Sequence, residues 1–418
     1  MRETETKAKK RPDTALISLL LFMALGYLLL HDLMGGTLLQ HCDWDSYTLQ
    51  AMAWREGRMD LGQNYDWLEL AIFEGKYYVS FPPLPSVLML PLTFLFGYNT
   101  PNNLVLLLLT MGCAAAAYRL ARLSGLRPFD GAVAALLLTW GSNLMWMSMQ
   151  GGVWFLAQGL NMLLLLLSAL AAAGNRRGLA YLCVALSVGC RPFSAVAFLP
   201  LFLWFYQKDR QKGKGFLPTA TGQWKAWIPV VLVAAALMWY NYARFGSTLE
   251  FGHNYLPEFL ESEKGQFDPS YIGENLLRIL RPVTLGEGLA LEYPVFDGFL
   301  FFVANPFFLW MFARIYRNFR GKSFDPVRVG LLAAQALNLV LLSAHKTFGG
   351  WQFGARYTCD LLPMALCYVC LSLHAPLRAG GEPLMAGAAP LRWWEKAVAV
   401  FGVAFNVYGA LAMTFLHG

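Results

Sequence analysis

The sequence predicts an all-α polytopic membrane protein. Hydrophobic residues fill 57% of the 418 positions and charged residues only 14%, whereas soluble proteins carry roughly 25% charged residues. Apolar runs of about 20 residues, the length that spans the hydrocarbon core as a helix, recur along the chain. The first run, 14–34, is too long for the core of a signal peptide, and no small-residue cleavage site follows it. We therefore expect it to be retained as the first helix.

Ten further spans complete a predicted bundle of about 11 transmembrane helices. They are 102–121, 131–147, 154–173, 178–190, 193–206, 226–243, 299–316, 327–344, 357–373 and 397–416. Lys and Arg cluster at 2–11, 119–127, 176–177, 208–214, 314–322 and 378–396. The positive-inside rule places these clusters in the cytoplasm. Acidic residues gather at 43–74 and 250–297. We expect a plasma-membrane protein with a cytoplasmic N-terminus and external loops at 37–101 and 244–298.

The apolar segment 84–96 decides the direction of every later span. If it crossed the membrane, the basic cluster at 119–127 would lie outside, and all later basic loops would change sides. The segment has only about 13 residues and contains Pro85 and Pro91, so it is short and broken for a span. We expect an external juxtamembrane or re-entrant helix. The whole chain, 1–418, is then one integral-membrane domain without a separate soluble domain.

Several functional classes are excluded by composition and motifs. The net charge of +7 is explained by basic cytoplasmic loops rather than by binding to nucleic acid. The seven cysteines show no CxxC or Cys/His ligand spacing, so neither disulfides nor zinc are predicted. The sequence contains no Walker loop, dinucleotide fingerprint, HExxH or GxSxG.

The first external loop opens on the carboxylate pair of Asp43-Trp44-Asp45. Tyr47 and Ala51 follow Asp43 at helical spacing, so we expect all three on one face of a short helix. Asp43 is the candidate base, with Asp45 as a second acid or alternative base, because a carboxylate can accept a proton from an attacking alcohol. The alternative is a solvated helix start, since Asp is a favoured N-cap. The pair has the spacing of a divalent-cation site, but two carboxylates alone make a weak one.

Cations on the predicted outer side form a second group of candidates. Arg191-Pro192 interrupts a long apolar stretch, where an ionisable residue is a functional candidate, although Arg191 could instead snorkel from a helix end. The segment 343–357 contains His345, Lys346 and Arg356 among glycines and aromatic residues. These cations suit phosphate binding, or else form an ordinary interfacial girdle. Arg356, which starts an apolar helix, is the stronger candidate than Lys346.

Other polar residues have a simpler expected role. Asn241 and Arg244 lie at the outer end of a predicted span, where they could cap the helix and anchor the following loop. Isolated intramembrane polar residues usually make interhelical hydrogen bonds. Those in this chain are Gln158, Asn161 and Gln335.

Five motifs follow one another along nearly the full chain. They are Asp43…Tyr47…Ala51, Pro82-Pro83-Leu84, Arg191-Pro192, Asn241…Phe245-Gly246 and Gly349-Gly350-Trp351…Phe353-Gly354-Ala355-Arg356-Tyr357. In this order and topology, the chain resembles the C-type glycosyltransferase superfamily. Within it, the chain is similar to the bacterial relatives of protein O-mannosyltransferases and to the lipid A aminoarabinose transferase. It departs from them at Trp44, where many relatives have Glu, and at Phe81, where aminoarabinose transferases have Lys. The soluble C-terminal domain of some relatives is not expected here.

The resemblance implies a polyprenyl-phosphate sugar as donor, transferred with inversion to a hydroxyl of a glycan, lipid or protein at the outer membrane face. The implied residues are Asp43 and Asp45 for catalysis, Lys76, Arg191, Arg356 and Lys346 for the donor phosphate, and Tyr47, Glu69, Tyr77, His345, Tyr357 and Asn241 for the substrates. No cofactor is predicted, although a divalent cation at Asp43 and Asp45 would be compatible with the pair.

A transporter or flippase of lipid-linked sugars is the alternative. It predicts charges deep in the bundle and two similar halves with paired broken helices. In this sequence the charges gather at the external face, and the halves do not match. The distribution of charge therefore favours the enzyme. Neither the sugar nor the acceptor leaves a mark in the sequence.

Overall fold

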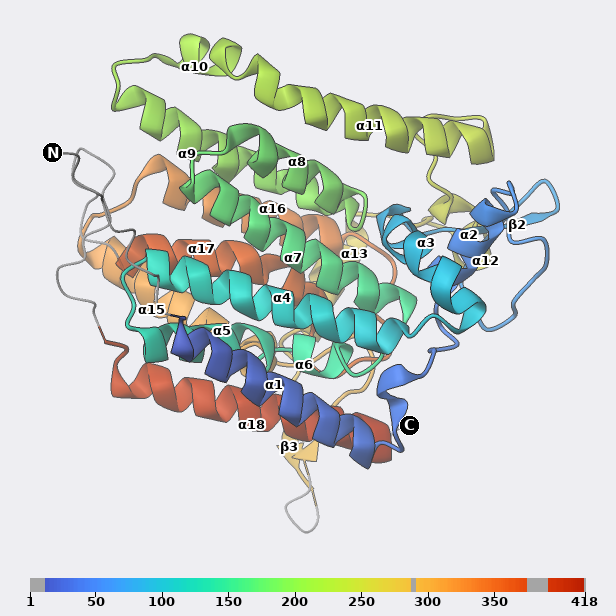
Figure 1. Cartoon of the computed structure of the whole chain (residues 1–418), viewed down its shortest axis with the longest axis horizontal. Helices are drawn as coiled ribbons and strands as arrows, with labels where there is room; N and C mark the ends of the chain where they lie inside the picture. Colours follow the sequence, from blue (N-terminus) through green and yellow to red (C-terminus); the bar gives the residue numbers. More distant parts are fainter. Residues whose placement is uncertain (1–11, 287–290, 374–389, 417–418) are drawn as a thin grey trace, which may run out of the picture.

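The computed structural model describes residues 12–286, 291–373 and 390–416. Its helices lie side by side in a bundle (Figure 1). Within the described residues, six helices are long and apolar enough to cross a membrane. They are α1 (Thr14–Leu33), α4 (Asn102–Leu123), α7 (Val153–Ala173), α11 (Trp224–Phe245), α16 (Pro326–Ser343) and α18 (Trp393–Phe415). The chain is therefore an all-α, multi-pass membrane protein, as the composition predicts.

The remaining five predicted spans correspond to shorter helices of 12 to 14 residues, below the ~20 residues of a straight span. They are α5 (Pro128–Thr139), α8 (Arg177–Val188), α9 (Phe198–Arg210), α15 (Phe307–Arg320) and α17 (Leu362–Leu373). Three of them adjoin short turns: α6 (Leu144–Met147) after α5, η3 (Pro192–Ala197) before α9, and η6 (Arg356–Leu361) before α17. The predicted break at Arg191-Pro192 is confirmed. A count of eleven spans stays a prediction.

The segment predicted as a juxtamembrane helix forms α3 (Leu84–Phe96), with the expected bounds. It packs against α2 (Ser46–Arg55) at one end of the bundle (Figure 1). The end of α1 and the start of α4 lie at this same end, so the chain between them returns to the side where it left the bundle. The loop also contains η1 (Thr37–Leu39), η2 (Gly97–Asn99) and a hairpin of β1 (Leu70–Phe73) and β2 (Lys76–Val79).

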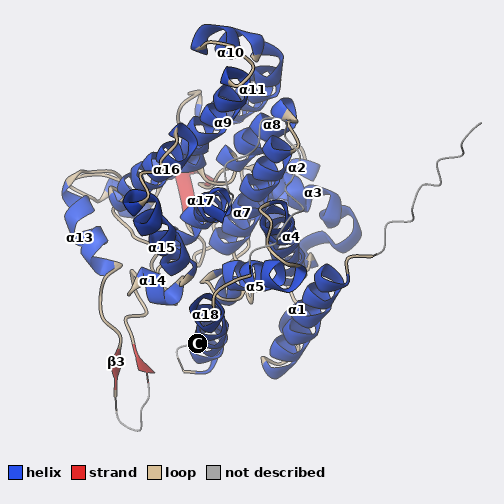
Figure 2. Cartoon of the chain, turned by 90° about the vertical axis from the view of Figure 1, so that its left-hand side faces the viewer, coloured by secondary structure: helices blue, strands red, loops and turns tan. Residues whose placement is uncertain are grey.

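The second large loop meets the first one at this end, which we call the loop end. Its short helix α12 lies beside α2 and β2 in Figure 1, while α10 (Phe216–Gly222) lies at the opposite end. Figure 2 shows the hairpin of β3 and β4 standing away from the bundle. The elements of this loop are η4 (His253–Tyr255), α12 (Pro257–Leu260), α13 (Ser270–Arg278), β3 (Thr284–Leu285), β4 (Leu291–Glu292) and α14 (Phe301–Ala304).

The bundle has an enclosed centre and an open edge. In α7, 78% of the apolar window is buried, whereas in α11 only 11% is buried. The rest of α11 presents apolar side chains such as Val231 and Leu232, as expected of a helix that faces lipid. α7 therefore lies in the interior of the bundle, and α11 lies at its lipid-facing edge.

Candidate functional site

The loop that carries Asp43 is hydrogen-bonded to the starts of two helices. Cys42 donates its backbone N–H to Asn102 Oδ1 (2.8 Å), and Asn102 Nδ2 donates to the carbonyl of Gly151 (2.9 Å). Val153 N donates to the carbonyl of Trp44 (2.9 Å). Asn102 is fully buried at the first residue of α4, so its amide satisfies backbone groups that water cannot reach. These bonds hold Asp43 at the loop end.

Asp43 and Asp45 have different environments. Asp45 is fully buried and is the N-cap of α2, where its carboxylate accepts from Tyr47 N (3.0 Å), Thr48 N (3.2 Å) and the Thr48 hydroxyl. Burial raises the pKa of this carboxyl group. The structure thus shows Asp45 in the capping role, and its role as a second acid stays a prediction. Asp43 is exposed, and its carboxylate makes no hydrogen bond or ion pair with the described residues.

The prediction that Asp43, Tyr47 and Ala51 share one helix face is wrong for Asp43. Asp43 precedes the N-cap of α2, so it does not share a face with Tyr47 and Ala51. Both of those side chains are fully buried. The Tyr47 hydroxyl has no hydrogen-bond partner among the described residues. Tyr47 interacts electrostatically with Arg191, and burial raises the pKa of Tyr47 well above its ordinary value. Tyr47 is therefore placed beside the cations rather than beside Asp43.

Two predicted cations, Arg191 and Arg356, both lie against the ring of Tyr357. Each guanidinium carbon is 4.9 Å from the centre of the Tyr357 ring. Arg191 is partly exposed and donates to Asp360 Oδ2 from Nε (3.0 Å) and Nη2 (2.8 Å). Its charge is therefore paired inside the protein.

Arg356 is bound only by neutral groups. It donates from Nε to the Gly349 carbonyl (2.9 Å) and from Nη1 to Gln158 Oε1 (3.0 Å). The same glutamine donates to Asp360 Oδ1 (3.2 Å). Arg356 is buried, and its Nη2 makes no hydrogen bond with the described residues. Its positive charge is thus available to an anion, while Arg191 shares its charge with a carboxylate.

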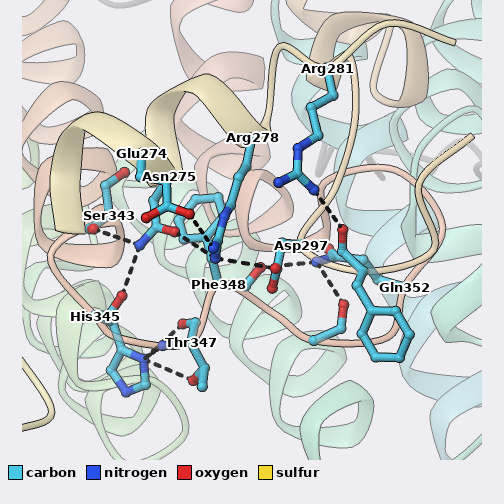
Figure 3. Close-up of polar contacts among 12 residues, drawn as sticks. Glu274, Asn275, Arg278, Arg281, Asp297, Ser343, His345, Thr347, Phe348 and Gln352 are labelled. Carbon is cyan, nitrogen blue, oxygen red and sulfur yellow. Dashed lines mark hydrogen bonds and ion pairs between the residues drawn. The ribbon is translucent and has the colours of Figure 1, made fainter. Parts of the chain in front are cut away.

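The loop before Arg356 is held in place by α13, as Figure 3 shows. Asn275 Nδ2 donates to the carbonyls of Ser343 and His345, both at 2.9 Å. Arg278 pairs with Asp297 at 3.1 Å, and Asp297 N donates to the Gly350 carbonyl (2.9 Å). The second large loop therefore determines where residues 343–357 lie.

Two histidines face one another in this loop region. The rings of His253 and His345 are 6.2 Å apart, and Phe259 contacts both rings. His253 also contacts Phe81, which contacts Tyr47. Burial lowers the pKa of each histidine to about 4. Both rings are therefore neutral at physiological pH and contribute hydrogen bonds rather than charge.

Glu69 is a carboxylate that lies between Asp43 and the two arginines. It accepts a hydrogen bond from Trp154 Nε1 (3.1 Å). Solvent reaches its side chain, yet desolvation by the surrounding protein raises its pKa, and Arg356 partly opposes this rise. An exposed group that is nevertheless desolvated lies in a concave surface. Glu69 is thus placed where a substrate would contact it.

Aromatic rings connect Asp43 to the cations. Trp44 lies 5.9 Å from Trp154, Trp154 lies 6.0 Å from Phe155, and the Arg356 guanidinium lies 5.7 Å from the Phe155 ring. Trp44 is exposed and Trp154 is half-buried, so a substrate that joins Asp43 and Arg356 would contact these two rings, whereas Phe155 is buried.

Four predicted residues have other positions or partners. Lys76 is exposed near the tip of the β1–β2 hairpin, and Tyr77 packs against the core with its carbonyl bonded to Leu61 N (2.8 Å). Asn241 bonds the Thr248 carbonyl (3.1 Å) and Arg244 (3.3 Å), so it anchors the following loop. Lys346 Nζ donates to the Glu258 carbonyl (2.7 Å). The structure therefore ties Tyr77 and Asn241 to the scaffold, leaves Lys76 exposed near the hairpin tip, and gives Lys346 a bond across the loop end.

Two residues of the site, Asp360 and His253, were not predicted from the sequence. A third, Gln158, was predicted only as an interhelical hydrogen-bonding residue. Asp360 lies inside an apolar run four positions after Arg356, and an intramembrane carboxylate was a signal that could have identified it. His253 lies in a polar loop and carried no such signal. Gln158 was expected to make an interhelical hydrogen bond, and this is confirmed by its bonds from α7 to Arg356 and Asp360.

An apolar groove of about 500 Å³ opens on the side of the bundle. Its lining comes from α3, α8, α11 and the end of α2 with the turn that follows it. It includes the apolar Leu84, Val87, Leu186 and Leu237, and Arg58 at one edge. The groove reaches Gly189, whose carbonyl accepts from Leu84 N (2.9 Å) and which lies two residues before Arg191. An apolar surface at the lipid-facing edge thus extends to the end of α8, two residues before Arg191.

Metal ligation is not indicated by clustering of side chains. Among residues 12–286, 291–373 and 390–416, no group of three or more His, Cys, Asp or Glu residues could hold a metal ion. Asp45 uses both carboxylate oxygens within α2. A cation shared by Asp43 and Asp45 stays a prediction.

No protein-family model and no curated protein matches the chain. Two solved structures are similar to it. ArnT from Cupriavidus metallidurans, bound to undecaprenyl phosphate, is 12% identical, with 84% of this chain and 59% of that chain covered and a TM-score of 0.49. The Archaeoglobus fulgidus oligosaccharyltransferase in its apo form is 14% identical, with 96% and 55% covered and a TM-score of 0.48.

The chain thus spans less than two thirds of either similar protein. At identities of 12% and 14%, an activity has to be inferred from the site itself, because one fold can carry many functions.

Proposed function

We propose that this protein is an inverting glycosyltransferase that moves a sugar from a polyprenyl-phosphate donor to an acceptor hydroxyl at the outer membrane face. The observation that carries the proposal is the apolar groove lined by α3, α8 and α11, which reaches Gly189, two residues before Arg191 in the chain. A lipid that carries a phosphate has these two parts, an apolar chain and an anionic head. Lateral entry past α11 would bring the chain into the groove and the phosphate to the arginines.

Arg356 is the principal phosphate ligand in this proposal. Its guanidinium has only neutral hydrogen-bond partners, so an incoming phosphate would supply its counter-charge. Arg191, paired with Asp360, would add hydrogen bonds more than net charge. Lys346 and Lys76 are secondary candidates, because the first lies across the loop end and the second near the hairpin tip.

Asp43 is proposed as the base because its exposed carboxylate has no hydrogen-bond partner among the described residues. As the acceptor oxygen attacks the anomeric carbon, its proton moves to Asp43. The new bond forms on the face opposite the phosphate, and the bond from the anomeric carbon to the phosphate oxygen breaks with its electron pair. The configuration inverts, and the arginines stabilise the negative charge on the leaving phosphate. Glu69 and Tyr357 would contact the sugar between them.

The test is transfer from a panel of radiolabelled polyprenyl-phosphate sugars by the purified protein. We expect Asp43→Asn to lose transfer by about 100-fold or more, the usual contribution of a general base, while it still binds labelled donor. Asp66→Asn is the matched control, because Asp66 is an exposed carboxylate in the same loop. Arg356→Gln should instead weaken donor binding.

The opposite results would reject the proposal. Equal transfer by wild type and Asp43→Asn would remove Asp43 as the base. No transfer with any donor and acceptor offered, together with lipid movement across vesicles that Asp43→Asn leaves unchanged, would favour the flippase.

A further inference from the structure

A second cavity at the loop end differs in chemistry from the apolar groove. It has a volume of about 360 Å³ and lies where loop 40–44 meets the ends of α1 and α18 and the start of α4. Asp43 lines this cavity, and none of the residues that line the apolar groove does. The candidate base therefore opens onto a compartment separate from the groove.

Three tryptophans form part of the cavity wall. Trp146 is 5% exposed and is fixed by ring contacts with Trp351 (5.4 Å) and Phe155 (4.9 Å). Trp44, from the same loop as Asp43, is 41% exposed. Such rings present a large apolar face with negative charge density at its centre, which attracts the slightly positive hydrogens of C–H groups. The wall is thus suited to a ligand with a flat face of C–H bonds.

Polar groups complete the lining. The carboxylate of Asp43 is unbonded, and Gln150 places an amide, both donor and acceptor, at the cavity. His41 hydrogen-bonds the Thr100 carbonyl through Nδ1 (3.1 Å). Its Nε2 has no partner among the described residues and could bond a ligand. A sugar ring combines a face of C–H bonds with an edge of hydroxyl groups that donate and accept. An acyl chain would leave these polar groups without partners, at a free-energy cost.

Building on the proposed glycosyltransferase, we infer that this cavity is the acceptor site and that the acceptor is a saccharide. A sugar ring would stack on Trp44 or Trp351 and place one hydroxyl beside Asp43, where its proton is removed. The donor sugar would approach from the arginines past Trp154 and Trp44, whose rings lie 5.9 Å apart. The inference selects a glycan from the three acceptor classes that the sequence left open.

The test is binding, measured without transfer. The full-length protein in lipid nanodiscs is mixed with a methyl hexopyranoside, a methyl pentofuranoside or a blocked Ser/Thr peptide, and saturation-transfer NMR detects which probe binds. We expect a glycoside signal that weakens about fivefold in Trp44→Leu and in Gln150→Leu, since an aromatic contact or a hydrogen bond contributes about 1 kcal/mol. Trp393→Leu is the matched control, because Trp393 is 81% exposed at the start of α18, away from the loop end.

Several results would overturn the inference. They are the absence of any glycoside signal, a signal of equal strength in Trp44→Leu and wild type, and binding of the peptide alone. Because glycoside binding is measured apart from sugar transfer, failure of this inference can be distinguished from failure of the proposed function. Glycoside binding without transfer from any donor would reject the enzyme, whereas transfer without glycoside binding at this cavity would reject only the saccharide site.

Discussion

Asp43 and Asp45 lie two positions apart, yet the fold gives them opposite environments. Asp45 turns inward and satisfies the first backbone N–H groups of α2, which have no partner within the helix. Asp43, two residues earlier and outside the helix, stays in contact with solvent. Sequence spacing alone could not separate these roles, because both residues fit an N-cap and both fit a base.

The capping role of Asp45 leads to a prediction with a built-in comparison. Asp45→Ala should lower the free energy of unfolding by about 1–2 kcal/mol, because Ala leaves Tyr47 N and Thr48 N without an acceptor. Asp45→Asn should remain close to wild type, because the amide oxygen still caps the helix. Thermal unfolding in detergent measures both. Loss of transfer in Asp45→Asn with an unchanged Tm would restore a catalytic role for Asp45.

Arg191 and Arg356 were both found in the sequence, but their partners were not. Arg191 pairs with Asp360, which lies 169 positions away, and Arg356 bonds Gln158, which lies 198 positions away. Only contacts over such distances reveal which cation is already neutralised. The same limit applies to Lys76, which is close in sequence to site residues but lies near a hairpin tip.

At the scale of elements, the contact between the starts of α4 and α7 determines the position of the Asp43 loop. Gly151 lies against the backbone of Asn102, and a Cβ at Gly151 would be 2.6 Å from the Asn102 carbonyl oxygen and 2.7 Å from Asn103 N. Only glycine permits this close approach. The backbone bonds to Cys42 and Trp44 depend on it.

Gly151→Ala should therefore separate the two helix starts. We expect destabilisation of about 1–3 kcal/mol, the usual effect of overpacking, and reduced transfer because loop 42–44 loses its anchor. Gly222→Ala is the control, because a Cβ there would meet nothing within 4 Å. Unfolding temperature and transfer rate are measured for both variants. Equal values for the two would show that the contact is not needed.

The histidine pair joins η4 to the loop before Arg356 and should make stability depend on pH. Burial lowers the pKa of His253 and of His345 from 6.5 to about 4. Between these values the unfolded chain binds more protons than the folded one, so stability falls as the pH falls from about 6.5 toward 4. Above pH 6.5 the contribution is fully present.

Unfolding temperatures at pH 7.5, 6.0 and 5.0 test this expectation. The wild type should lose stability over this range, and the double variant His253→Gln, His345→Gln should lose less. An equal loss in the double variant would assign the pH dependence to other groups. Asp45 and Glu69, whose pKa values are raised by burial, give the opposite sign, because they release their protons later in the folded state.

At the scale of the whole molecule, the charges separate along the bundle. The two large loops, which contain Asp43, Glu69 and His253, gather at one end, and α10 with the basic 208–214 segment lies at the other (Figure 1). The positive-inside rule predicts that the basic end faces the cytoplasm. Such an arrangement would place the candidate site where lipid-linked donors and glycans meet outside the cell.

Cysteine labelling tests this orientation. Gln63→Cys in the first loop should react with a membrane-impermeant maleimide in intact cells, whereas Lys214→Cys should react only after permeabilisation, because both positions are exposed at opposite ends. The natural cysteines are buried or half-buried, so their background should be low. The reverse labelling pattern would invert the topology and exclude an external site.

The sequence by itself determined the membrane class, the bounds of α3 and the break at Arg191-Pro192. These features depend on local properties: the length of apolar runs and the effect of proline on the backbone. The tertiary structure decided which carboxylate caps a helix, which arginine keeps an unpaired charge, and that an apolar groove and a tryptophan-lined cavity flank the site. Cavities and ion pairs arise between residues far apart in the chain, so no local pattern could specify them.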